Sequence, residues 1–106
     1  MLQQQLERLA ERGINLLPAV EITSYFIFER DGFVALVERQ EDGFGNIGAP
    51  GLLVESGGFA ALVWRGEAPW FVARGHEEPA TADQVAGIRK FAHDLDWALK
   101  LIPEAG

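Results

Sequence analysis

The feature that most constrains this fold is an Asp31-Gly32 pair between two runs rich in β-branched and aromatic residues. A two-residue hairpin loop of this kind needs positive φ at both positions, which Asp and Gly tolerate. The pair therefore predicts a β-hairpin over residues 20–40.

The two faces of the predicted hairpin differ in character. Directly opposed residues share a face, and one face carries the pairs Phe28–Ala35 and Phe26–Val37. The other face is apolar in the middle and polar at its ends, with Ile27 opposite Leu36 and Tyr25 opposite Glu38. A sheet with one solvated face shows cleaner alternation. We therefore expect the mixed face to be partly covered by a helix, a loop or another subunit.

Helical patterns lie near both ends of the chain. Leucines recur at helical spacing over residues 2–12, and Gly13 is a natural stop. Near the C-terminus, Thr81 and Gln84 match a capping box, and Pro103 ends the predicted helix. One apolar stripe runs along this second helix: Val85, Ile88, Phe91, Ala92, Leu95, Leu99 and Ile102.

The middle of the chain predicts further strands. A second hairpin is expected over residues 59–65 and 70–74, across a loop that holds Pro69, with a short strand over residues 52–55. Residues 41–51 hold four glycines and a proline, and residues 75–79 are turn-rich, so both are expected to be loops.

These elements predict one α+β domain over residues 1–106. The expected architecture is an antiparallel sheet of four or five strands with the N- and C-terminal helices packed against it. Its element order is α-β-β-β-β-β-α, with the third strand the weakest.

Composition excludes several classes of function. The chain has no cysteine, so disulfides, thiolate metal sites and cysteine nucleophiles are absent. Nine basic against sixteen acidic residues give a net charge of −7, which disfavours nucleic acid and anionic membrane surfaces. No apolar run reaches the roughly 20 residues of a membrane span, and the start lacks a signal-peptide pattern. We expect a cytoplasmic protein.

Three features could carry chemistry, and each lacks a required part. Residues 43–48 match GxGxxG, but Pro50 and a short apolar run follow where a phosphate-binding helix should begin. His76 and His93 each have acidic neighbours, too few on one face for a metal site. Ser56 lacks the G-x-S-x-G context of a nucleophile. We expect no metal, no cofactor and no enzymatic activity.

A candidate contact surface lies on the last helix. Trp97 and Leu101 are neighbours on the side opposite the core stripe. They are either a contact surface, together with Tyr25, Ile27 and Leu36 of the hairpin, or they are covered by the first helix or by residues 14–17.

Two layouts resemble known families. The segment LERLAERGINLLPAVEITSYFIFERDGFVAL, residues 6–36, is similar to the opening of roadblock-type domains, although the helix expected after the second strand is replaced by residues 41–51. The end of the chain, PATADQVAGIRKFAHDLDWALKL, resembles in layout the small acidic secretion chaperones. Either resemblance implies a dimeric interaction module.

Two functions are compatible with these features. The leading hypothesis is a non-catalytic, homodimeric protein-interaction or chaperone-like regulatory module, whose partner is a second copy or another protein. The alternative is a small-ligand-binding domain in which residues 41–51 form a lid over a pocket between sheet and helix. Three aromatic residues would line that pocket: Phe44, Trp64 and Trp70.

Overall fold

The computed structural model describes residues 2–17, 24–41, 43–53 and 59–101, and within them the chain is an α+β fold. The elements in chain order are α1 (Leu2–Glu11), β1 (Asn15–Leu17), β2 (Tyr25–Arg30), β3 (Phe33–Gln40), β4 (Gly43–Ile47), β5 (Gly51–Leu53), β6 (Phe59–Arg65), β7 (Ala68–Ala73), β8 (His76–Pro79) and α2 (Ala82–Leu99).

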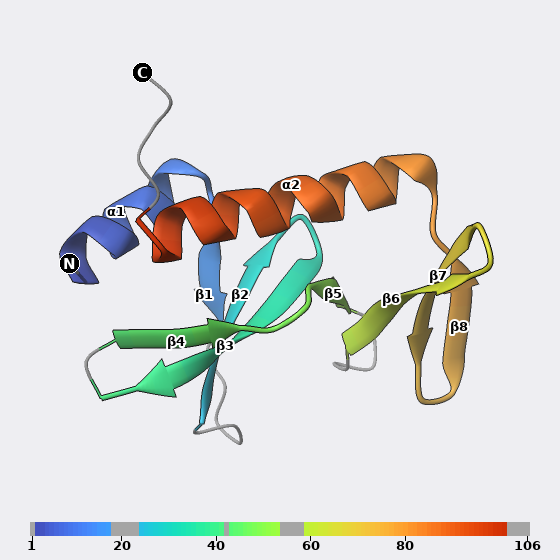
Figure 1. The fold of residues 1–106 in the computed structure, drawn as a ribbon, viewed down its shortest axis with the longest axis horizontal. Coiled ribbons are helices and arrows are strands. Elements are labelled where there is room, and N and C mark those ends of the chain that lie inside the picture. The colour runs from blue at the N-terminus through green and yellow to red at the C-terminus, as the bar shows by residue number, and fades with distance from the viewer. Residues whose placement is uncertain (1, 18–23, 42, 54–58, 102–106) are drawn as a thin grey trace.

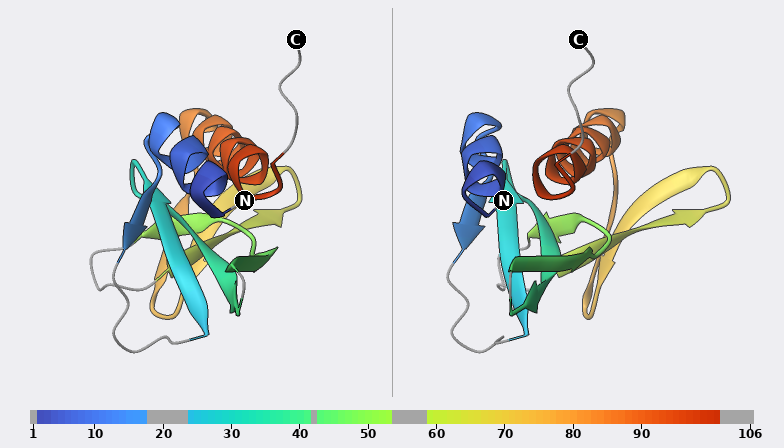
Figure 2. Two further views of the ribbon diagram at one scale, coloured as in Figure 1. Left: turned by 90° about the vertical axis from the view of Figure 1, so that its left-hand side faces the viewer. Right: turned by 60° about the vertical axis from the view of Figure 1, so that its left-hand side comes forward.

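All eight strands belong to one antiparallel sheet. Its order is β1-β2-β3-β5-β6-β7-β8, and β4 pairs with β3 on the same side as β5. The sheet curls into an open half-barrel, and the two terminal helices lie side by side against it (Figure 1). Figure 2 shows β6, β7 and β8 turning away from β2 and β3 below the N-terminal half of α2.

The expectation of four or five strands is wrong because three strands have sequences that lack the usual strand pattern. β1 has three residues, β4 is rich in glycine, and β8 reads His-Glu-Glu-Pro. Backbone hydrogen bonds to a neighbouring strand form these elements, and glycine or glutamate supplies the same backbone groups as valine. Residues 41–51 and 75–79 are therefore not simply loops.

The first hairpin forms as predicted from Tyr25 to Gln40, and residues 20–23 of the predicted span lie outside the described residues. Asp31 and Gly32 have φ of 55° and 87°, the values a two-residue loop requires. The register pairs Phe28 with Ala35 and Ile27 with Leu36. In the second hairpin the turn is tighter than expected, because Pro69 already lies in β7 opposite Trp64.

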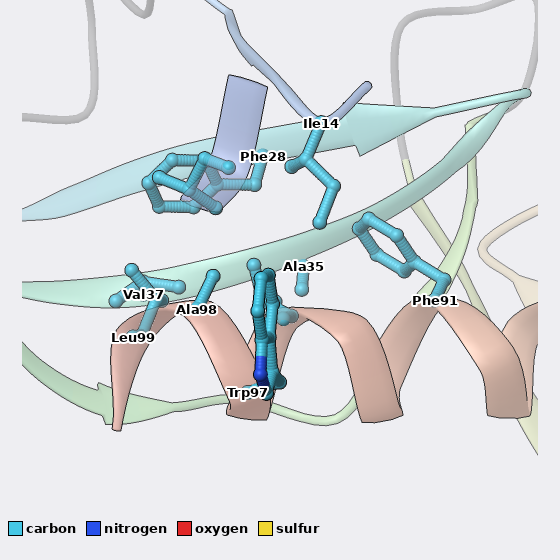
Figure 3. Packing of buried hydrophobic residues seen from close by; sticks show 10 residues of the cluster. Ile14, Phe28, Ala35, Val37, Phe91, Trp97, Ala98 and Leu99 are labelled. Carbon is cyan, nitrogen blue, oxygen red and sulfur yellow. The ribbon is translucent and has the colours of Figure 1, made fainter. Parts of the chain in front are cut away.

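Within the described residues the core has two clusters of buried residues, both on the sheet face that meets α2. The larger lies where the first hairpin faces α2 (Figure 3), and α1 contributes Leu9 to it. Its members are Leu9, Ile14, Phe28, Ala35, Val37, Phe91, Leu95, Trp97, Ala98 and Leu99. The smaller contains Ala60, Phe71 and Ile88. Phe33 packs against both clusters, so it joins the two parts of the core.

α2 begins at the predicted capping box. The Thr81 hydroxyl accepts a hydrogen bond from the Gln84 N–H at 3.1 Å, and the Gln84 side chain accepts one from the Thr81 N–H at 2.8 Å. The helix ends at Leu99, with Lys100 as its cap. The predicted stop at Pro103 lies outside the described residues.

α1 binds the last turn of α2 through polar side chains. Gln5 Nε2 donates to the Leu99 carbonyl at 2.7 Å, and Arg8 Nη1 donates to the Trp97 carbonyl at 2.8 Å. Carbonyls near the end of a helix need partners of this kind. The first helix therefore both covers and caps the second.

Candidate functional site

A cavity of about 540 Å³ lies between the C-terminal half of α2 and residues 45–50, and we call it the β4–α2 cavity. Figure 1 shows β4 below that half of the helix. The sheet wall is formed by Gly45, Asn46, Ile47, Gly48, Ala49 and Pro50, with Ala35 of β3. The helix wall is formed by Ala92, Leu95, Asp96 and Lys100.

The cavity exists because the strand beside β3 is interrupted and the surrounding side chains are small. β4 pairs with one end of β3 and β5 with the other, and residues 48–50 leave the ladder between them. The Gly48 N–H still donates to the Leu36 carbonyl at 2.8 Å. Ala35 and Ala92, on opposite walls, are too short to fill the space above this interruption.

The cavity has an apolar floor and a polar rim. Ala35 and Leu95 are buried and present methyl groups. At the rim, Lys100 Nζ lies 3.4 Å from Asp96 Oδ1, and the two side chains are 62% and 41% exposed. Asn46 Nδ2 donates to Glu38 Oε2 at 3.3 Å. The arrangement offers charged and amide groups beside an apolar surface.

None of the three aromatic residues predicted for a pocket lines this cavity. Phe44 packs in the core, with its ring centre 5.1 Å from that of Phe26 and 5.6 Å from that of Phe28. Trp64 is about half exposed, at 51%. Trp70 lies beneath the Arg65 guanidinium, 4.9 Å from its carbon. That these three residues bind a ligand remains a prediction.

Trp97 is covered by the first helix, the alternative that the sequence left open. The residue is 6% exposed, and the guanidinium groups of Arg8 and Arg12 both lie over its ring, with their carbons 4.4 and 4.3 Å from the ring centre. Leu101 is half-buried. A partner could reach the Trp97 ring only after α1 had moved.

The remaining predicted contact residues lie on the sheet face turned away from α2. Tyr25 is 41% exposed, Leu36 is half-buried and Ile27 is buried. They alternate with Phe28 and Ala35, which point into the larger cluster. Their role as an interface stays a prediction.

A basic hollow of about 300 Å³ was not foreseen from the sequence. Arg12, Arg30 and Lys90 line it together with Asp31, Phe33 and Gly87. Its charge is partly neutralised, because Arg30 pairs with the buried carboxylate of Asp94 at 2.8 Å. The burial of Asp94 has one signal in the sequence, because this residue lies between the apolar positions Phe91 and Leu95 of the helix.

In the described residues, the glycine motif does not form a phosphate-binding loop and the histidines do not form a metal site. Gly45 and Gly48 line the β4–α2 cavity, but β5 follows them and no helix begins there, as the sequence indicated. His76 Nε2 lies 3.4 Å from Glu78 Oε2 on β8, while His93 is exposed on α2. Within the described ranges, no three His, Asp or Glu side chains converge as metal ligands. Ser56 lies outside those ranges.

Comparison with known proteins gives no relative: no protein family, curated protein or solved structure matches the chain. Among the helices of the described residues, none has the length and apolar character needed to cross a bilayer.

Proposed function

We propose that this chain is a non-catalytic binding domain that holds its ligand in the β4–α2 cavity. The observation that carries the proposal is an accessible cavity of about 540 Å³ between sheet and helix, with an apolar floor and a polar rim. Binding sites for small molecules commonly have this size and lie between packed elements.

The walls indicate the character of the ligand. Its apolar part would contact Ala35 and Leu95, and its polar part would face the Asp96–Lys100 pair. The glycines of the sheet wall bring the backbone close to the ligand, as short side chains allow. A ligand with one apolar and one polar end fits this arrangement.

The test is a screen of small-molecule fragments by two-dimensional amide NMR. Fragments that bind should shift the amide signals of Gly45, Gly48 and Lys100. Ala92→Phe fills the cavity and should abolish these shifts. Ala86→Phe, on an exposed position of the same helix, is the matched control and should keep them. Shifts that survive Ala92→Phe, or no shifts at these amides, would contradict the proposal.

A second candidate is the homodimeric interaction or chaperone-like module. What supports it is Tyr25, 41% exposed beside half-buried Leu36 on the sheet face away from the helices. Light scattering during size-exclusion chromatography would test it, with Tyr25→Asp as the variant. A dimer that becomes a folded monomer is the expected result, and a monomeric wild type would contradict it.

A further inference from the structure

β4 has a free edge. Among the described strands it hydrogen-bonds to β3 alone, whereas β5 continues the sheet to β6. A strand directs its N–H and C=O groups alternately to its two sides. The outer side of β4 therefore carries donors and acceptors that no described strand pairs.

This edge differs from the other margins of the sheet. β8 carries Glu77, Glu78 and Pro79, residues that discourage the addition of a further strand. β1 is three residues long. β4 is five residues long, with no charge and no proline, and Asn46 is exposed. Of these three margins, β4 is the most open to a new strand.

The β4–α2 cavity lies beside this free edge. A strand added to β4 would direct every second side chain toward α2, because side chains alternate between the faces of a sheet. One such side chain would then enter the space between Ala92 and residues 45–50. The edge would supply backbone pairing and the cavity would supply side-chain selectivity, which together make up recognition by strand addition.

We propose that β4 binds an extended peptide segment of another protein, with one apolar side chain of that segment in the β4–α2 cavity. The inference rests on the proposed binding function and specifies its ligand. The net charge of −7 favours a segment that is neutral or basic.

A second copy of this chain fits the same edge less well. Phe44 and Ile47 of β4 already pack against the chain's own core. A partner β4 would therefore offer no large apolar side chain to fill the cavity. Two copies would also each carry a charge of −7, which opposes their approach.

The test begins with displayed random peptides of about ten residues, a length that spans one strand. Peptides selected on the wild-type domain are synthesised, and their affinity is measured by calorimetry. We expect Ala92→Phe to weaken binding by at least about tenfold, and Ala86→Phe to leave it unchanged. Peptides that bind Ala92→Phe as well as wild type, or a library that yields no binder, would overturn the inference.

Backbone methylation of the peptide separates strand addition from other modes. Each N-methyl group removes one backbone N–H donor from the peptide. In an added strand only every second N–H faces β4, so methylation at those positions should weaken binding by at least about tenfold. Methylation at the intervening positions should have little effect. A uniform pattern would overturn the inference. If fragments bind the cavity and no peptide does, this inference fails while the proposed function stands. A wild-type dimer with β4 amides protected from exchange would overturn it in favour of self-pairing.

Discussion

Arg30 and Asp94 form an ion pair of 2.8 Å, with side chains that are 16% and 6% exposed. The same nitrogen of Arg30 donates to the Arg12 carbonyl at 3.0 Å. One guanidinium thus joins the tip of the β2–β3 hairpin to the middle of α2 and to the chain that follows α1. The pair fixes three segments that lie far apart in the sequence.

Removing the buried carboxylate should destabilise the domain markedly. Asp94→Ala leaves Arg30 without its partner, and breaking a buried pair in this way costs about 3 kcal/mol of unfolding free energy. Urea unfolding measures the loss. Asp96→Ala is the matched control, because its pair with Lys100 is exposed and contributes below about 0.5 kcal/mol. Equal losses in the two variants would contradict the role of Asp94.

Trp97 is predicted to act as a core residue of the single chain. Trp97→Ala removes a ring that contacts two arginines and belongs to the larger cluster, at a cost of about 3–5 kcal/mol. Trp64→Ala, at a side chain 51% exposed, should cost below about 1 kcal/mol. Urea unfolding compares the two. A Trp97→Ala protein as stable as wild type would show that the ring is not packed here.

Gly51 allows β5 and β6 to approach closely. A Cβ at this position would lie 2.5 Å from the Ala60 carbonyl oxygen, a backbone atom that cannot move aside. Gly51→Ala should therefore cost about 2 kcal/mol. Gly45→Ala is the control, because its Cβ would meet the movable side chain of Gln40 and should cost below about 0.5 kcal/mol. Thermal unfolding should rank the variants in this order.

The contribution of the α2 capping box to the stability of the domain should be measurable with one substitution. Thr81→Ala removes the hydroxyl that accepts from the Gln84 N–H, which costs about 1 kcal/mol. For a domain of this size that loss lowers Tm by about 5 °C. Circular dichroism measures it. Thr81→Ser keeps an acceptor at the same place and should stay near wild type, and an equal drop in both variants would argue against capping.

The sequence predicted those parts of the fold that depend on neighbouring residues. The Asp31-Gly32 turn and the Thr81–Gln84 cap are local, so their residues determine their geometry wherever they occur. The apolar stripe of α2 likewise follows from spacing. In α1 the same spacing was a poorer guide, because Leu9 is buried while Leu2 and Leu6 are each 47% exposed. The α+β class followed from these elements.

The remaining features depend on contacts between distant segments. Arg8 and Trp97 meet across 89 positions, so no local pattern could show that α1 covers the ring. β1, β4 and β8 owe their form to neighbouring strands, and their own side chains give a weak signal. The cavity wall consists mainly of small residues, whereas the predicted lining was aromatic. A space left by short side chains has no sequence signature.

The interruption beside β3 also divides the sheet into two parts, β1–β4 and β5–β8, which could open separately. Between them the backbone ladder is short, joining Phe33 to Leu52 and Val34 to Gly51. Each part has its own buried cluster, and the single helix α2 packs over both parts (Figure 1). Opening of the β5–β8 part would break this short ladder and the contacts of Ile88, and would leave the first hairpin and α1 in place. Amide exchange should then show two levels of protection along one sheet, with the change at β5.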